Sequence, residues 1–219
     1  MTLDPLTERR LRSLDLPAGP LFVVDVDDVV LTFVGPLREL IADEGLHLVT
    51  DTYRLHGNVR DRSGEAVANE RVSALIDRVF AEQERRQRPV DGAQEGLDRL
   101  SRHGAVVLLT AMRHGHFEAR ERHLRAQGID HPLVTTEGSK GRAIASVASE
   151  GPVVFVDDLP SNHADVLTHV PHATAIHFMA EPVFAHVMPP LPEPVLVAES
   201  WEAIVETALG AIAGNSEGR

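Results

Sequence analysis

The stretch LFVVDVDDVV, residues 21–30, constrains the fold of this chain more than any other part. Four apolar residues run directly into Asp25, and Asp27 and Asp28 follow almost at once. A short unbroken apolar run is typical of a strand buried on both faces, as in a parallel sheet covered by helices. Ligands bind beyond the carboxyl ends of such strands, and three neighbouring acids repel one another unless a cation lies nearby. The stretch therefore predicts a buried strand that ends either in a divalent-cation site or in a solvated acidic turn.

Length and composition limit the class of protein. With 219 residues, of which 43% are hydrophobic, the chain suits one globular domain with a modest insertion. The net charge of −12 argues against binding to a nucleic-acid polymer or to an anionic membrane. No apolar run approaches the roughly 18 residues of a membrane span, and the first residues do not resemble a signal peptide. The absence of cysteine fits a reducing cytoplasm, whereas nothing indicates an oligomeric state.

Strand-like and helix-like segments alternate through most of the chain. We expect buried strands at 21–25, 105–110, 132–134, 152–156, 173–178 and 195–197, separated by amphipathic helices. This alternation predicts an α/β fold, a Rossmann-like three-layer α/β/α core with a mainly parallel sheet. Residues 33–88, called the cap segment below, lack buried apolar strands and contain helical spacing from Pro36 to near Gly45 and from Ala68 to about Gln87. We expect a core of residues 1–32 and 89–219 and a small, mostly helical insertion.

Several predicted strands end in polar residues, and one predicted helix begins with a lysine. In a parallel sheet the carboxyl ends of all strands lie on one edge, so these residues are expected to converge: Asp25, Asp27, Thr110, Lys140, Asp157 and Asp158. A carboxylate nucleophile, a hydroxyl donor, an ammonium group and acids for a cation suit phosphoryl transfer, which depends mainly on positioning and charge stabilisation. A solvated lysine and an acidic helix cap are the alternatives for Lys140 and the Asp157–Asp158 pair.

Four segments in this order resemble the motifs of the haloacid dehalogenase (HAD) superfamily. They read LFVVDVDD, VVLLTAM, GSKGRAI and VVFVDDLPSN, and they span residues 21–162. Each segment is short, but four in the expected order, three of them on apolar strands, are specific together. The cap segment falls between the first and second motifs, where many members of the superfamily carry a cap domain.

The resemblance implies a role for each matched residue. Asp25 would attack phosphorus and form an aspartyl-phosphate, while Asp27 would protonate the leaving oxygen and later deprotonate water. Thr110 and the adjacent Ala111 would contact the phosphoryl oxygens, and Lys140 would neutralise charge between the nucleophile and the phosphate. Because dehalogenases need no such acid, Asp27 favours phosphoryl chemistry over carbon–halogen cleavage.

The resemblance also implies a bound Mg²⁺ ion. Its ligands would be Asp25, the backbone oxygen of Asp27, and Asp158 with Asp157 nearby, and the motifs leave open which of the last two binds directly. Asp28 departs from the superfamily pattern, in which glycine commonly follows the second aspartate, and its carboxylate could bind a backbone amide instead. Mg²⁺ with oxygen ligands would screen the repulsion between a carboxylate and a phosphate dianion.

The expected function is a magnesium-dependent phosphohydrolase that acts on a small phosphorylated metabolite or nucleotide. A phosphomutase or nucleotidase of the same superfamily uses the same residues, and a phosphate-binding or regulatory protein without turnover is a different class. The cap segment also contains a group of basic residues, Arg54, His56, Arg60, Arg62 and Arg71. These residues could contact an anionic substrate or, more simply, could form salt bridges on the surface with Asp61, Glu65 and Glu70.

Overall fold

The computed structural model describes residues 3–149 and 151–214, and strands alternate with helices along them. The elements follow in the order α1 (Pro5–Arg12), β1 (Leu21–Val24), α2 (Val34–Asp43), β2 (His47–Leu48), β3 (Val59–Arg60), α3 (Asn69–Ala81), α4 (Gln83–Arg86), α5 (Ala93–Ser101), β4 (Ala105–Thr110), η1 (His114–His116), α6 (Phe117–Ala126), β5 (Leu133–Thr135), α7 (Lys140–Ala145), β6 (Val153–Asp157), α8 (Pro160–His169), β7 (Thr174–His177), η2 (Ala185–Val187), β8 (Val195–Val197) and α9 (Trp201–Gly214).

The main sheet has the strand order β5-β4-β1-β6-β7-β8, and all of its pairings are parallel. From β1 the chain proceeds outward to β4 and β5, then returns to the other side of β1 and proceeds outward again through β6, β7 and β8. Neighbouring strands whose connections lead away in opposite directions leave a crevice at their carboxyl ends, and ligands bind in that crevice. The order of strands therefore places the candidate site at the ends of β1 and β6.

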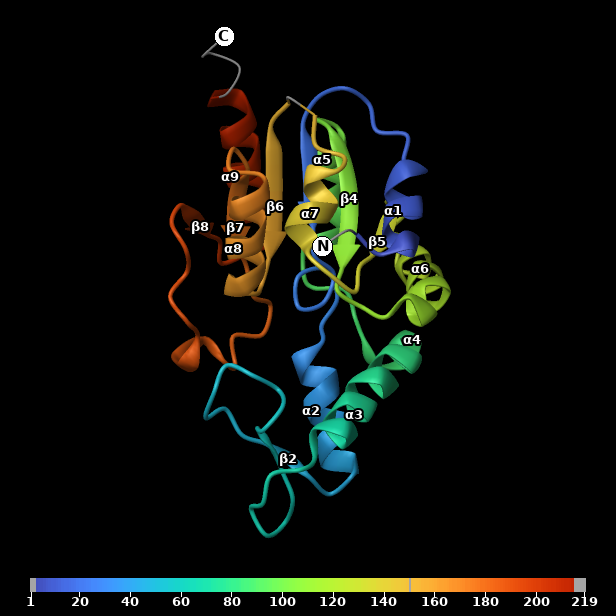
Figure 1. Cartoon of the computed structure of the whole chain (residues 1–219), viewed down its shortest axis with the longest axis vertical. Coiled ribbons are helices and arrows are strands. Elements are labelled where there is room, and N and C mark those ends of the chain that lie inside the picture. The colour runs from blue at the N-terminus through green and yellow to red at the C-terminus, as the bar shows by residue number, and fades with distance from the viewer. Residues whose placement is uncertain (1–2, 150, 215–219) are drawn as a thin grey trace.

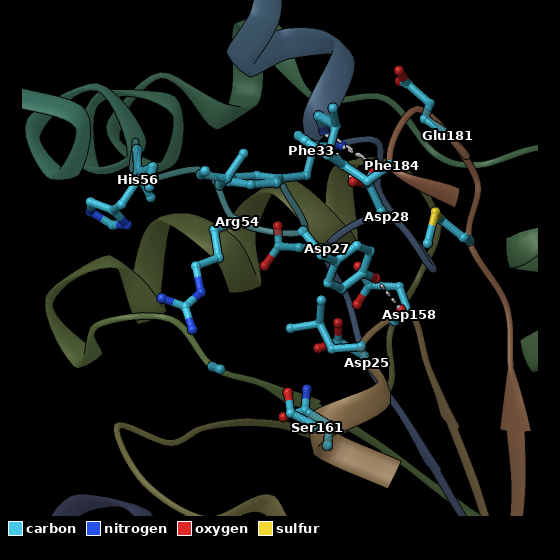
Figure 2. Close-up of a pocket in the computed structure, with 18 of the residues that line it drawn as sticks. Asp25, Asp27, Asp28, Phe33, Arg54, His56, Asp158, Ser161, Glu181 and Phe184 are labelled. Atoms are coloured by element: carbon cyan, nitrogen blue, oxygen red, sulfur yellow. Dashed lines mark hydrogen bonds between the residues drawn. The ribbon is translucent and has the colours of Figure 1, made fainter. Parts of the chain in front are cut away.

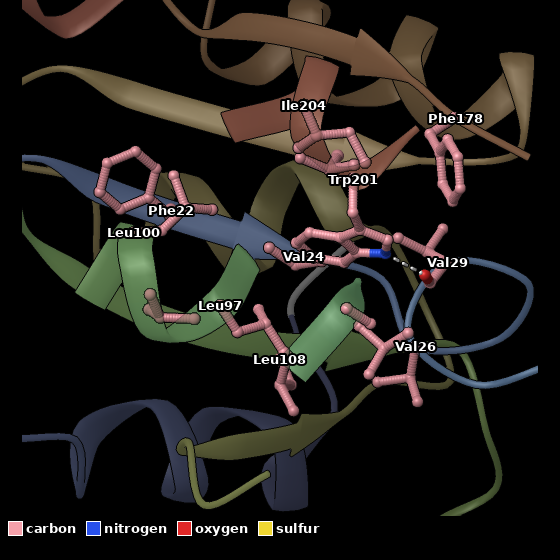
Figure 3. Close-up of a cluster of buried hydrophobic side chains, with 14 of the residues drawn as sticks. Phe22, Val24, Val26, Val29, Leu97, Leu100, Leu108, Phe178, Trp201 and Ile204 are labelled. Carbon is pink, nitrogen blue, oxygen red and sulfur yellow. Dashed lines mark hydrogen bonds between the residues drawn. The ribbon is translucent and has the colours of Figure 1, made fainter. Parts of the chain in front are cut away.

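Alternating side chains of each central strand build two separate cores. Phe22 and Val24 of β1 pack in one cluster with α5 and α9, whereas Leu21 and Val23 pack in the other with α1, α7 and α8. This period of two is what a strand covered on both faces requires. In the first core the indole of Trp201 donates a hydrogen bond from Nε1 to the carbonyl oxygen of Val29 at 2.9 Å, which ties α9 to the loop after β1 (Figure 3). The predicted three-layer α/β/α architecture is confirmed.

The cap segment forms its own hydrophobic cluster beyond the carboxyl ends of the strands. In Figure 1, α2, α3 and β2 lie together at the bottom of the view, past the arrowhead of β4. Apolar residues of α2 and α3 pack on one another and on the two-stranded antiparallel β2–β3 ribbon, including Leu37, Leu40, Val59, Val72 and Leu75. The two connections to the core run side by side, since the amide of Thr32 donates to the carbonyl of Arg88 and that of Val90 to Val30, both at 2.9 Å.

Some predicted boundaries in the cap segment are wrong. The first helix begins at Val34, before Pro36, because proline is well tolerated in the first turn. The single helix expected to reach about Gln87 is interrupted at Glu82, which has φ −103° and ψ 16° and separates α3 from α4. The β2–β3 ribbon was not predicted, because two-residue strands carry too little alternation to detect. Among the described residues, none of the helices has the length and apolar character needed to cross a membrane.

Candidate active site

The side chain of Lys140 bridges two carboxylates at the crevice between β1 and β6. Its Nζ donates to Oδ1 of Asp25 at 2.6 Å and to Oδ2 of Asp157 at 2.7 Å. All three residues are almost completely buried. Asp25 directly follows β1, and its amide continues the sheet by donating to the carbonyl of Val156 at 2.9 Å. Three residues that lie far apart in the sequence therefore meet at one point on the sheet edge, as the motifs predicted.

The start of α7 places Lys140. Ser139 caps this helix, since its Oγ accepts from the amide of Arg142 at 3.0 Å and donates to the carboxylate of Asp165 on α8 at 2.8 Å. Gly141 allows the two helices to approach closely, because a Cβ atom at this position would lie 2.4 Å from the carbonyl oxygen of Asp165. The GSKG sequence thus fixes both the start of the helix and the direction from which the lysine enters the site.

Asp157 and Asp158 have different surroundings. Oδ1 of Asp157 accepts from the amide of Leu159 and from Nδ2 of Asn162, both at 2.8 Å, and Oδ2 accepts from Lys140. Asp158 instead lines the cavity, and its carbonyl oxygen accepts a hydrogen bond from the hydroxyl of Tyr53 at 3.2 Å. Asp157 is therefore already saturated with protein donors, whereas the Asp158 carboxylate faces the space where a ligand would lie.

Carboxylate oxygens of Asp25, Asp157 and Asp158 lie within 4.8 Å of one another. Burial raises the pKa of Asp25 to about 7, against the opposing effect of Lys140. Burial and the charges of Asp157 and Asp25 also raise the pKa of Asp158 well above its usual range. Burial alone would lower the pKa of Lys140, but the two carboxylates outweigh it and raise that pKa. Crowded carboxylates form a set of hard oxygen donors whose mutual repulsion a divalent cation would relieve.

Asp27 lies on the other side of Asp25, beside Thr110. The hydroxyl of Thr110 donates to Oδ2 of Asp27 at 3.0 Å, and Oδ1 of Asp27 accepts from Arg120 at 2.9 Å and from Gln87 at 3.0 Å. Thr110 is completely buried and does not line the cavity, whereas Ala111, which follows it, does. The structure thus brings Asp27, Thr110 and Ala111 together with Asp25 and Lys140 around one crevice.

Asp28 holds the entry to the cap segment. Its backbone has φ 58°, its Oδ1 accepts from the amide of Phe33 at 2.8 Å, and both oxygens accept from the amide of Val34. Burial raises its pKa to about 7, although these amide bonds oppose the shift. The expectation that Asp28 binds backbone amides is confirmed, and this acid serves the turn into α2.

A cavity of about 490 Å³ separates the acidic crevice from the cap segment. Figure 2 shows Asp25, Asp27 and Asp158 gathered around one space, with Phe33 and Phe184 beyond them and Ser161 on the opposite wall. The rings of Phe33 and Phe80 are stacked, with centroids 5.4 Å apart. One end of the cavity is therefore acidic and polar, and the other is aromatic and aliphatic.

The basic residues of the cap segment do not form the predicted salt-bridged face. Arg60 pairs with Asp51 at 3.8 Å and Arg71 with Glu44 at 3.6 Å, so the expected partners were wrong. The exposed Arg54 lines the cavity, and its guanidinium has no ion-pair partner among residues 3–149 and 151–214. Of this group, Arg54 and His56 border the cavity and are placed to meet an anionic ligand.

Three residues of the site were not anticipated from the sequence: Tyr53, Gln87 and Arg120. For Arg120 a signal was present, because it falls on the inward stripe of α6 marked by Phe117 and Leu124, where a charged residue needs a buried partner. Tyr53 and Gln87 lie in irregular or short segments, and no pattern points to them.

No protein-family model and no curated protein matches the chain, but solved structures do. A haloacid dehalogenase-like family hydrolase from Xanthomonas campestris has a TM-score of 0.60 at 16% identity, over 91% of this chain and 99% of that one. A HAD family hydrolase from Deinococcus radiodurans, with bound phosphate and sodium, has a TM-score of 0.56 at 14% identity, over 88% and 96%. A putative HAD-hydrolase from Bacillus subtilis, bound to magnesium, has a TM-score of 0.56 at 13% identity, over 88% and 99%. The chain therefore has the fold of HAD-like hydrolases.

Proposed function

We propose that this chain is a magnesium-dependent phosphohydrolase of the HAD superfamily that cleaves a small phosphate monoester through an aspartyl-phosphate on Asp25. The observation that carries the proposal is the buried bridge from Lys140 to Asp25 and Asp157 at the crevice between β1 and β6. A carboxylate held by an ammonium group at this edge of the sheet has the charge partner that a nucleophile needs next to a phosphate.

The donor set supports Mg²⁺ as the cofactor. Carboxylate oxygens within 4.8 Å of one another, with raised pKa values at Asp25 and Asp158, fit a hard divalent cation with oxygen ligands. We assign direct binding to Asp25 and Asp158 and to the backbone oxygen of Asp27, because Asp157 is already engaged by Lys140 and Asn162. The ion would screen the repulsion between the carboxylates and the phosphate dianion.

The chemical steps follow from the positions of the side chains. A carboxylate oxygen of Asp25 forms a bond to phosphorus as the bond from phosphorus to the leaving oxygen breaks, and Asp27 supplies a proton to that oxygen. In the second half, Asp27 takes a proton from water as the water attacks the phosphorus and releases Asp25. Lys140 holds Asp25 in place throughout. Thr110 and Ala111 would contact the phosphoryl oxygens, for which the hydroxyl of Thr110 must turn from Asp27.

The cap segment, which we assign as a domain separate from the core, supplies the other wall of the cavity. Its stacked Phe33 and Phe80 favour a leaving group with a flat or apolar surface. Arg54, which has no ion-pair partner in the described part of the chain, favours an anionic one. Nucleotides combine these properties and are one candidate class among small phosphorylated metabolites. The cysteine-free, acidic chain fits a cytoplasmic enzyme that acts on such compounds and not on nucleic-acid polymers.

The test is phosphate release by the purified protein from an aryl phosphate ester, with Mg²⁺ and with a chelator. We expect release only with Mg²⁺, and we expect Asp25→Asn to abolish it. Asp98→Asn, at an exposed position, is the matched control and should match the wild type. Robust turnover by the Asp25→Asn protein would refute the mechanism. Transfer of the phosphoryl group to a sugar phosphate without release would instead identify a phosphomutase, and a screen of sugar, nucleotide and acid phosphates would define the substrate.

A further inference from the structure

Arg120 is a completely buried arginine on the inward face of α6. A buried arginine is costly, and well-packed apolar residues often serve a protein's stability equally well. Its Nη1 atom also has no hydrogen-bond partner among the described residues, so the hydrogen-bonding capacity of the guanidinium is not fully used. Stability alone therefore gives little reason for an arginine at this position. The contacts of its side chain indicate a functional role instead.

The principal charged partner of Arg120 is Asp27. Nη2 donates to Oδ1 of Asp27 at 2.9 Å, and Gln87 donates to the same oxygen from Nε2 at 3.0 Å. Among the residues that the structure describes, the other oxygen, Oδ2, accepts only from the hydroxyl of Thr110, at 3.0 Å. The carboxylate is thus anchored through one oxygen by two donors, while its second oxygen is held by a hydroxyl that can rotate.

Arg120 is itself fixed by the end of the cap segment. Its Nε donates to Oε1 of Gln83 and its Nη2 to Oε1 of Gln87, and it lies 5.5 Å from the ring centre of Phe80. Gln83 in turn donates to the carbonyl of Phe80 at 2.7 Å, and Gln87 to that of Thr32 at 2.8 Å. The guanidinium therefore connects Asp27 to the helix through which the chain returns from the cap segment to the core.

We infer that Arg120 is a positioning residue for Asp27: together with Gln87 it anchors Oδ1, so that Oδ2 is the oxygen that exchanges the proton. This inference rests on the proposed function, in which Asp27 protonates the leaving oxygen. When Thr110 turns toward the phosphoryl group, Oδ2 becomes free, and the anchored Oδ1 keeps the carboxyl group from rotating away. Arg120 contacts Asp27 through a single donor, Nη2, and the bonds from its Nε to Gln83 and from Nη2 to Gln87 fix the plane of the guanidinium.

The inference predicts a selective defect. A proton donor matters most when the leaving group is poor, so loss of the anchor should affect a phenyl phosphate more than a 2,4-dinitrophenyl phosphate. General acid catalysis contributes about 10²–10⁴-fold, and we expect Asp27→Asn to lose about 10²-fold more kcat/KM on the phenyl ester than on the dinitrophenyl ester. Arg120→Met should show the same selectivity in kcat/KM at about 10-fold or more. Arg120→Lys should recover part of it, because one donor can still reach Oδ1.

The matched control is Arg122→Met on the same helix, where the side chain is 64% exposed and lies 3.5 Å from Glu84; it should leave both esters unaffected. An equal loss on both esters by Arg120→Met, or no loss, would overturn the inference. If wild-type protein cleaves neither ester, or if Asp27→Asn is not selective, the proposed function fails instead. Crystal structures of the Arg120→Met and Arg120→Lys proteins test the positioning role independently of kinetics. Asp27 should lose its contacts with Gln87 and Thr110 in the Arg120→Met protein and keep them in the Arg120→Lys protein. An unmoved Asp27 in the Arg120→Met protein would refute the positioning role.

Discussion

Lys140 holds Asp25 through a hydrogen bond of 2.6 Å between Nζ and Oδ1, with both side chains almost completely shielded from water. Lys140 is the only lysine in a chain that otherwise uses arginine for its basic side chains. A compact ammonium group can enter the narrow space between Asp25 and Asp157, whereas a guanidinium is larger and planar. The choice of lysine at this position therefore follows from the geometry of the crevice.

Replacing Lys140 by methionine should destabilise the fold as well as abolish activity. Removal of one partner from a buried ion pair leaves an uncompensated charge and costs about 3–5 kcal/mol. The free energy of unfolding from urea titrations at neutral pH measures the loss. Arg85→Met, which breaks an ion pair at a side chain that is 68% exposed, is the control and should change stability little.

A double variant separates charge from packing at this position. If the uncompensated carboxylates cause the loss, adding Asp25→Asn to Lys140→Met should restore part of the unfolding free energy. Equal stability of the single and double variants would show that the lysine side chain contributes through packing alone.

Mg²⁺ should stabilise the protein against thermal unfolding through Asp158. A ligand that binds only the folded state adds about 2.7 kcal/mol at a concentration of 100 times its dissociation constant. The melting temperature with and without Mg²⁺ measures this effect, which Asp158→Asn should largely remove. Asp61→Asn, in a loop of the cap segment, should retain the full shift. A shift that survives Asp158→Asn would contradict the assigned ligand set.

Asp28 should make the stability of the protein depend on pH. Its pKa is about 7 in the folded protein and 3.8 as an ordinary side chain, so between these values the folded state holds a proton that the unfolded state has released. Stability from this group is therefore fully present at low pH and lost as pH rises toward about 7, with a slope of at most about 1.4 kcal/mol per pH unit.

Urea titrations across this pH range, with a chelator present, test the role of Asp28. The curve for Asp28→Asn should fall less steeply than that of the wild type, because asparagine does not titrate. Parallel curves would show that Asp28 keeps an ordinary pKa. Comparing slopes avoids the offset that the altered hydrogen bonds to Phe33 and Val34 will cause.

The sequence predicted the framework of the site because its signals are local. The apolar runs before Asp25, Thr110 and Asp157 identify three neighbouring strands, and parallel pairing then brings their ends together. Ser139, which caps α7 just before Lys140, is of a residue type that favours the start of a helix. These inferences need only periodicity and capping.

The parts that were missed depend on packing between distant segments. The bond between Arg120 and Asp27 joins residues separated by 93 positions, and Arg120 is also bonded to Gln83 of α4, which packs against α6. The break at Glu82 lies beside a long-range contact, because Arg78 donates both to Glu82 and to Glu44, 34 positions away. Tyr53 reaches Asp158 from an irregular loop. Such contacts follow from the tertiary structure and leave little trace in a single sequence.

The most direct test of the account is to trap the phosphorylated residue. Protein mixed with substrate and Mg²⁺ and quenched during turnover is treated with borohydride, which reduces an acyl phosphate to the corresponding alcohol, and the peptides are then mapped by mass spectrometry. We predict homoserine at position 25 and at no other aspartate, with none in the Asp25→Asn protein or without substrate. Turnover with an unmodified Asp25, or with the label at Asp27 or Asp158, would contradict the assignment of Asp25 as the nucleophile.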